Sequence, residues 1–212
     1  MHFGPRLPRR FSQLALGLFL YGIALAMMVR AAIGVSPWDV LTQGVDRQTG
    51  LGFGLITVLV GALVLLLWIP LRQRPGLGTI ANVLFIGPSV EVGLAVIPTQ
   101  TEPLPQGVLF AGGLALLAVA TGLYIGAGFG PGPRDGLMTG IHRRTGWPIW
   151  VGRSIVELTV LGVGWILGGN VGIGTVAFAL LIGPMVNVTL PLLTVPLDRT
   201  PQVLATGKEV PA

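Results

Sequence analysis

The chain has 212 residues, of which 52% are hydrophobic and only 10% are charged, and it contains no cysteine. Soluble domains carry about 25% charged residues, so this composition excludes an ordinary soluble fold and indicates a membrane protein. The missing cysteine excludes disulfides, thiolate metal sites, iron–sulfur clusters and cysteine nucleophiles. The net charge of +5 comes from basic residues scattered at the ends of apolar segments, so we expect no nucleic-acid partner.

Six apolar segments are long enough to cross the hydrocarbon core of a bilayer, which needs about 20 residues. In chain order they are 11–29, 52–70, 77–97, 107–126, 149–168 and 171–193. The sequence therefore predicts an all-α membrane protein with six transmembrane helices, and the lipid bilayer is its expected partner.

Basic residues predict the orientation of these segments, because Lys and Arg favour the cytoplasmic side of a membrane. With both termini in the cytoplasm, eleven of the 13 basic residues lie on that side, and only Arg30 and Arg47 lie outside. We therefore expect residues 1–10 and the tail 194–212 to be cytoplasmic. Residues 98–106 are then an external linker.

The first segment has a second interpretation, as a cleaved signal peptide. Basic residues precede its apolar run, and Ala24-Leu25-Ala26 resembles a small-residue cleavage site. Against this, the segment has a counterpart at 107–126 inside the chain. We therefore expect it to be retained as a span.

The sequence repeats itself at an offset of 96 residues without gaps. The matched groups include Pro37 with Pro133, Asp39 with Asp135, Gly76-Leu77-Gly78-Thr79 with Gly172-Ile173-Gly174-Thr175, and Ile86-Gly87-Pro88 with Ile182-Gly183-Pro184. From Gly34 to Leu94, about 23 of the 61 pairs are identical. Each half holds three spans, and an odd number of crossings makes the second half enter the membrane from the opposite side. The sequence predicts two inverted repeats, 11–97 and 107–193, an arrangement found in many secondary transporters.

A short helix with both ends marked is expected after the first span. Ser36 is suited to the N-cap, Pro37 to the first helical position, Asp39 to the first turn, and Gly50 to the position beyond the end. Thirteen residues rise about 20 Å, which is too short to span a bilayer. We therefore predict that Pro37–Thr49 and its copy Pro133–Thr145 are interfacial or re-entrant helices.

Asp39 and Asp135 occupy equivalent places in these two short helices. One interpretation is that they complement the positive end of the helix dipole. The other is that they take part in binding a substrate or a proton. Both are therefore candidate site residues.

Gly87-Pro88 and Gly183-Pro184 lie near the middle of the third and sixth spans. Proline removes a backbone hydrogen bond, so these positions are expected to kink or break their helices. Paired interruptions in corresponding helices indicate a transporter site. The alternative is that glycine and proline only allow close helix packing.

Polar residues inside the spans are the remaining site candidates. Glu91 and Asn187 are equivalent in the two halves, and we expect both to project towards the interface between them. An acid within a span costs about 2.5–3.5 kcal/mol and usually faces a partner or a cavity, so functional and structural roles both stay open. Arg153 and Glu157, four residues apart, predict a structural ion pair, and Asn82 predicts a hydrogen bond between helices.

Motifs of most enzymes are missing. The sequence has no Walker loop, no HExxH pair and no nucleophile elbow, and His2 and His142 lie near or beyond the ends of spans. We therefore expect a protein that is not an enzyme, with no cofactor and no metal site.

Gly34-Val35-Ser36-Pro37-Trp38-Asp39, Thr49-Gly50, Pro75-Gly76-Leu77-Gly78-Thr79 and Ile86-Gly87-Pro88 together form an ordered set of motifs. This set resembles the YczE/YyaS-like group of bacterial membrane proteins, which is related to the wider YitT group. The resemblance covers about residues 11–193. It implies a location in the bacterial inner membrane and supplies no agreed substrate.

Two functions are compatible with these observations. The leading hypothesis is a small secondary transporter or permease, with a proton at Glu91 and a path lined by Asn187 and the two Gly-Pro pairs. The alternative is a non-transporting accessory protein that positions another membrane component. A membrane-embedded enzyme is a third and weaker option, and a homodimer or a membrane partner is compatible with each.

Overall fold

The computed structural model describes residues 7–195, and these residues form eight helices and no strand. The helices are α1 (Leu7–Ala31), α2 (Pro37–Thr49), α3 (Phe53–Trp68), α4 (Leu77–Val96), α5 (Pro103–Gly126), α6 (Pro133–Thr145), α7 (Ile149–Ile166) and α8 (Ile173–Leu193). The all-α prediction is confirmed for this part of the chain. Most of the expected cytoplasmic segment and of the expected tail lies outside the described residues.

Five of the helices, α1, α4, α5, α7 and α8, are long and apolar enough to cross a membrane. The remaining expected span, 52–70, corresponds to α3, which has only 16 residues and meets α2 at a bend of 119°. The structure thus offers five spans, or six if α2 and α3 together form a broken one. Residues 103–106, expected in the linker, already belong to α5.

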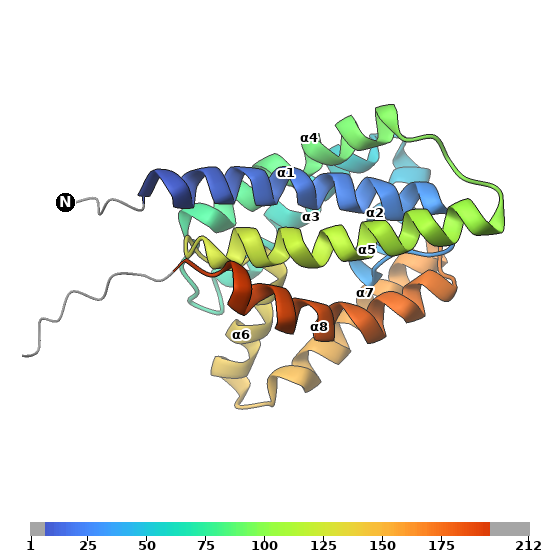
Figure 1. Ribbon diagram of the computed structural model, residues 1–212. Helices are drawn as coiled ribbons and strands as arrows, with labels where there is room; N and C mark the ends of the chain where they lie inside the picture. Colours follow the sequence, from blue (N-terminus) through green and yellow to red (C-terminus); the bar gives the residue numbers. More distant parts are fainter. Residues whose placement is uncertain (1–6, 196–212) are drawn as a thin grey trace, which may run out of the picture.

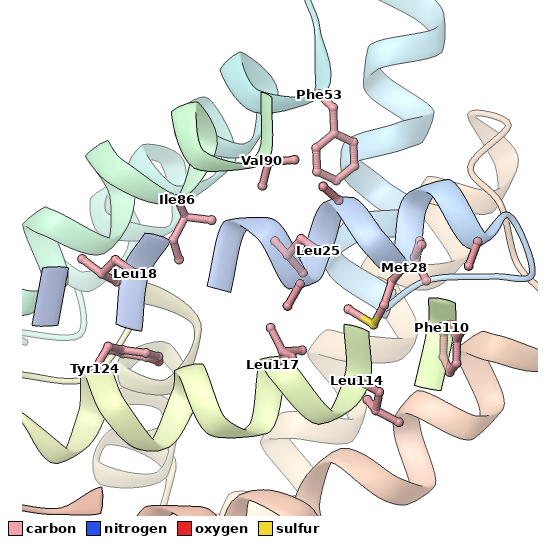
Figure 2. Close-up of a cluster of buried hydrophobic side chains, with 14 of the residues drawn as sticks. Leu18, Leu25, Met28, Phe53, Ile86, Val90, Phe110, Leu114, Leu117 and Tyr124 are labelled. Carbon is pink, nitrogen blue, oxygen red and sulfur yellow. The ribbon is translucent and has the colours of Figure 1, made fainter. Parts of the chain in front are cut away.

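The centre of the fold is the pair α1 and α5, which run side by side, with α4 on the far side of α1 and α8 on the far side of α5 (Figure 1). Glycine allows the central pair to approach closely, because a Cβ on Gly17 would lie 2.8 Å from the backbone nitrogen of Tyr124. Figure 2 shows Leu18, Leu25 and Met28 of α1 in the core with Leu117 of α5. This apolar packing holds the helices that surround the site.

The short helices have the ends that the sequence predicts. Ser36 accepts a hydrogen bond from the backbone N–H of Asp39 at 3.3 Å, and Gly50 ends α2 in the left-handed conformation. In α6, Gly146 has the same conformation and the same role. Each short helix packs on a helix of the other half: α2 on α7, and α6 on α3.

The two halves repeat local backbone conformations as well as residues. Equivalent helices begin 96 residues apart throughout. Gly34 and Gly130, equivalent in the repeat, have φ angles of 114° and 116°, and Gly50 and Gly146 have 68° and 72°. The sequence repeat is therefore a repeat of structural elements.

Of the expected kink or break at the prolines, the break is wrong, because α4 and α8 run continuously through Pro88 and Pro184, and the kink stays a prediction. A proline removes only one backbone hydrogen bond, and the packing of the rest of the helix can tolerate that loss. In α4 the Ser89 hydroxyl donates to the carbonyl of Phe85 at 2.7 Å, whereas the carbonyl that Pro88 leaves without its regular backbone donor is that of Leu84.

Candidate functional site

A cavity of about 240 Å³ lies at the centre of the molecule, and all eight helices contribute to its wall. Much of the wall is apolar, with Leu25, Ile86 and Leu117 among its residues. Its polar side chains come from both halves: Tyr21, Ser36, Thr57, Asn82, Thr121, Tyr124, Arg134, Asp135, Arg153, Glu157 and Asn187. Pockets that hold drug-sized ligands measure about 300–1,000 Å³, so this cavity suits a smaller solute.

The first turns of both short helices form part of the cavity wall. Pro37 and Trp38 come from α2, and Pro133, Arg134 and Asp135 come from α6. The first turn of a helix has backbone N–H groups without intrahelical partners and carries the positive end of the helix dipole. The starts of two helices, one from each half, therefore border one chamber.

Arg134 joins the two short helices. Its guanidinium lies 3.5 Å from Oδ1 of Asp39 and 5.1 Å from the centre of the Trp38 ring, both on α2. Asp39 is only 1% exposed, and among the described residues its Oδ1 has no hydrogen-bond partner. The guanidinium is thus the group that compensates this buried carboxylate, together with the Ser36 hydroxyl, which donates to the other oxygen.

Asp135 has a different partner from its repeat equivalent. Its carboxylate accepts a hydrogen bond from the Tyr124 hydroxyl at 3.1 Å. The Tyr124 ring meets the Tyr21 ring edge-on, with 5.9 Å between ring centres. The chain has only two tyrosines, and both line the cavity.

The expected ion pair on α7 is present. Nε of Arg153 lies 2.9 Å from Oε1 of Glu157, and both side chains line the cavity. The side chains are 51% and 26% exposed, so the pair lies where the cavity is open. An exposed pair of this kind stabilises the fold little, and it contributes polar groups to the chamber.

The structure separates the remaining candidates into two sets. Asn187, Gly183 and Asp135 line the cavity, whereas Glu91, Gly87, Pro88, Pro184 and Asp39 do not. Oε1 of Glu91 instead accepts the backbone N–H of Gly54 at 2.5 Å, at the start of α3. A carboxylate is favourable there because the start of a helix is electropositive. Glu91 and Asn187 are therefore not brought together.

Sequence analysis did not single out Arg134, Trp38, Tyr21 or Tyr124 as site residues. Arg134 had a usable signal, since a basic residue next to Asp135 in a short helix of a membrane protein is uncommon and needs a partner. The chain has only two tyrosines, and this rarity was a second signal, which pointed to Tyr21 and Tyr124. Within residues 7–195, no group of three or more His, Asp and Glu side chains is placed to hold a metal ion.

Residues 8–191 match the model of the family of unknown function DUF6198, and the chain belongs to that family. An uncharacterized protein of Haemophilus influenzae is 37% identical over 84% of this chain and 82% of its own length. The uncharacterized membrane protein YczE of Bacillus subtilis is 32% identical over 82% of each chain, and the uncharacterized protein YyaS of the same species is 25% identical over 86% of this chain and 93% of its own. No solved structure matches. The expected resemblance to the YczE/YyaS group is confirmed, and with the apolar helices it identifies a membrane protein.

Proposed function

We propose that this member of the DUF6198 family is a small secondary transporter of the bacterial cytoplasmic membrane, which carries a small polar solute through the central cavity. The observation that carries the proposal is the cavity itself, because both halves line it and the first turns of both short helices form part of its wall. Interrupted helices that direct their N-termini at a central site are typical of secondary transporters built from inverted repeats.

In this proposal the two halves are inverted and both termini are cytoplasmic. The first described residues of α1 and the end of α8 lie at the same end of the molecule (Figure 1). At that end Arg144 donates to the carbonyl of Pro70. This hydrogen bond joins the α6–α7 connection to the α3–α4 connection. Arg30 donates to the carbonyl of Leu94 near the end of α4, and Arg47 donates to the carbonyl of Gly168 just after α7. These ends of α4 and α7 lie at the opposite end of the molecule (Figure 1). This distribution agrees with the preference of basic residues for the cytoplasmic side.

The side chains of the cavity favour a small solute that carries polar groups. Arg153 is paired with Glu157, and Arg134 with Asp39, so the two basic residues of the wall do not form a free anion site. The Tyr21 hydroxyl and the amides of Asn82 and Asn187 also line the cavity, and they can donate or accept hydrogen bonds. The protein in this proposal is not an enzyme and uses no cofactor, and Glu91 supports α3 rather than the transport path.

Labelling of a single cysteine tests whether the cavity is a transport path. The chain has no native cysteine, so Thr121→Cys places one thiol in the cavity wall. We expect a membrane-impermeant thiol reagent to label it in right-side-out and in inside-out vesicles, because a transporter exposes its site to each side in turn. Val119→Cys is the matched control: Val119 lies two residues away on α5, does not line the cavity and is 38% exposed. The thiol of Val119→Cys should stay unlabelled in vesicles of either orientation.

Labelling of Thr121→Cys from one side only, or from neither, would refute the transport proposal. It would favour the alternative, a non-transporting accessory protein. The observation behind that alternative is the apolar outer surface of the second half, where Trp165 is 67% exposed and Ile166 84%. Such surface fits lipid, a second copy of the chain or a membrane partner. Co-purification of one defined partner in mild detergent would support this alternative.

A further inference from the structure

The two halves differ at one pair of equivalent interfaces. In the first half α3 packs along α4, whereas in the second half α7 and α8 make almost no contact. Figure 1 shows α7 and α8 meeting at the connection 167–172 and diverging towards their other ends. We refer to this space as the α7–α8 gap.

The α3–α4 interface is closed by glycines. A Cβ on Gly54 would lie 2.6 Å from the carbonyl oxygen of Gly87, and a Cβ on Gly61 would lie 3.7 Å from the Cβ of Val83. The hydrogen bond from Gly54 N–H to Glu91 holds the same end of the interface. In the proposed topology this is the external end of the first half.

The equivalent positions of the second half are open. Gly183, the equivalent of Gly87, would have no atom within 4 Å of an added Cβ. Trp150, the equivalent of Gly54, is 70% exposed, and Asn187, the equivalent of Glu91, faces the cavity. Where α3 has the small residues Thr57 and Gly61, α7 has Arg153 and Glu157, which also line the cavity.

The gap is closed at its external end. The N–H of Gly174 donates to the carbonyl of Ile33 at 2.8 Å, and the N–H of Asn170 donates to the Gln43 side chain at 2.9 Å. These bonds fix the start of α8 and the end of α7 to the first half. The gap is therefore a wedge that widens towards the cytoplasmic end of the molecule, where α7 begins.

From this asymmetry we infer that α3–α4 and α7–α8 are the two gates of the transporter, and that this structure is its inward-open state. The inference rests on the proposed transport function. In inverted repeats the two halves exchange conformations when the site turns to the other side of the membrane. In the outward-open state α7 closes on α8 as α3 now closes on α4, and α3 separates from α4.

In the outward-open state, the exchange of conformations between the two halves creates contacts that this structure does not contain. Asn187 comes to the start of α7 as Glu91 now lies at the start of α3, so its amide oxygen can accept the N–H of Trp150. Glu157 comes beside Ala179, the equivalent of Val83. Arg153 and Glu157 then enter the closed interface as a pair, and a paired charge is far less costly to bury than a single one.

Cysteine pairs at equivalent positions test the inference. Gly61→Cys with Val83→Cys is the reference pair, since a distance of 3.7 Å between Cβ atoms suits a disulfide and the chain has no other cysteine. Glu157→Cys with Ala179→Cys is the equivalent pair across the gap. Under mild oxidation of membranes we expect the reference pair to cross-link directly and the second pair to cross-link in the fraction of molecules that close the gap.

A second gap pair, Trp150→Cys with Asn187→Cys, keeps Arg153 and Glu157 intact. It therefore controls for a local effect of losing Glu157.

The decisive variant carries both the reference pair at positions 61 and 83 and the gap pair at positions 157 and 179. Mass spectrometry of the oxidised protein should find one disulfide or the other in each molecule. Both disulfides in the same molecule would overturn the reciprocal gates, and so would no cross-link in either gap pair while the reference pair reacts.

These outcomes are separable from the test of transport itself. If Thr121→Cys is labelled from both sides but neither gap pair cross-links, the transport proposal stands and the gates lie elsewhere. If Thr121→Cys is labelled from the cytoplasmic side alone and neither gap pair cross-links, the gap is permanent and both proposals fail.

Discussion

The contact between Arg134 and Asp39 permits a quantitative prediction. Arg134→Ala removes a basic group that lies at ion-pair distance from the Asp39 carboxylate, which is 1% exposed. Loss of one partner of a buried pair costs about 3–5 kcal/mol, because the other charge stays buried without compensation. The Arg134 side chain is 26% exposed and its distance to Asp39 is 3.5 Å, so the lower end applies. We expect a loss of about 3 kcal/mol in the free energy of unfolding, including a small cation–π contribution from Trp38.

Reversible unfolding in mixed detergent, followed by circular dichroism, measures this loss. Arg143→Ala is the matched control on the same helix, since its contact with Gln73 is exposed and 3.4 Å long, and it should cost under about 1 kcal/mol. In a double-mutant cycle, Asp39→Asn should recover much of the loss caused by Arg134→Ala, because it removes the stranded charge. A cost for Arg134→Ala no larger than that of Arg143→Ala would refute the argument, and so would strict additivity in the cycle.

Three further predictions follow from the repeat and its asymmetry. Gly87→Ala should destabilise the protein by about 1–3 kcal/mol through overpacking, whereas Gly183→Ala should be neutral or slightly stabilising, and thermal unfolding of the two variants separates these outcomes. Glu91→Gln should cost about 1 kcal/mol, since a neutral amide replaces a carboxylate at a helix start; a cost above about 3 kcal/mol would contradict this role. An impermeant thiol reagent applied to intact cells should label Gln48→Cys and not Arg144→Cys, which are equivalent positions of the two halves, and labelling of both would contradict the inverted topology.

The sequence by itself determined which segments are helical, and it gave the limits of the two short helices. Serine, proline and glycine mark the ends of α2 and α6 through local hydrogen bonds and backbone conformations, so their bounds could be read without the fold. The apolar segments located the longer helices, because the hydrophobic thickness of a membrane sets their length. The repeat at an offset of 96 residues correctly matched every helix with its equivalent.

The composition of the site was decided only by the tertiary structure. Glu91 and Asn187 are equivalent in the sequence, yet Glu91 binds the start of α3 and Asn187 faces the cavity, because α4 packs on α3 while α8 stands apart from α7. The contact between Arg134 and Asp39 joins residues 95 positions apart on helices of different halves. Local pattern sets which residues are helical, whereas the direction of a side chain and its partner depend on how whole helices pack.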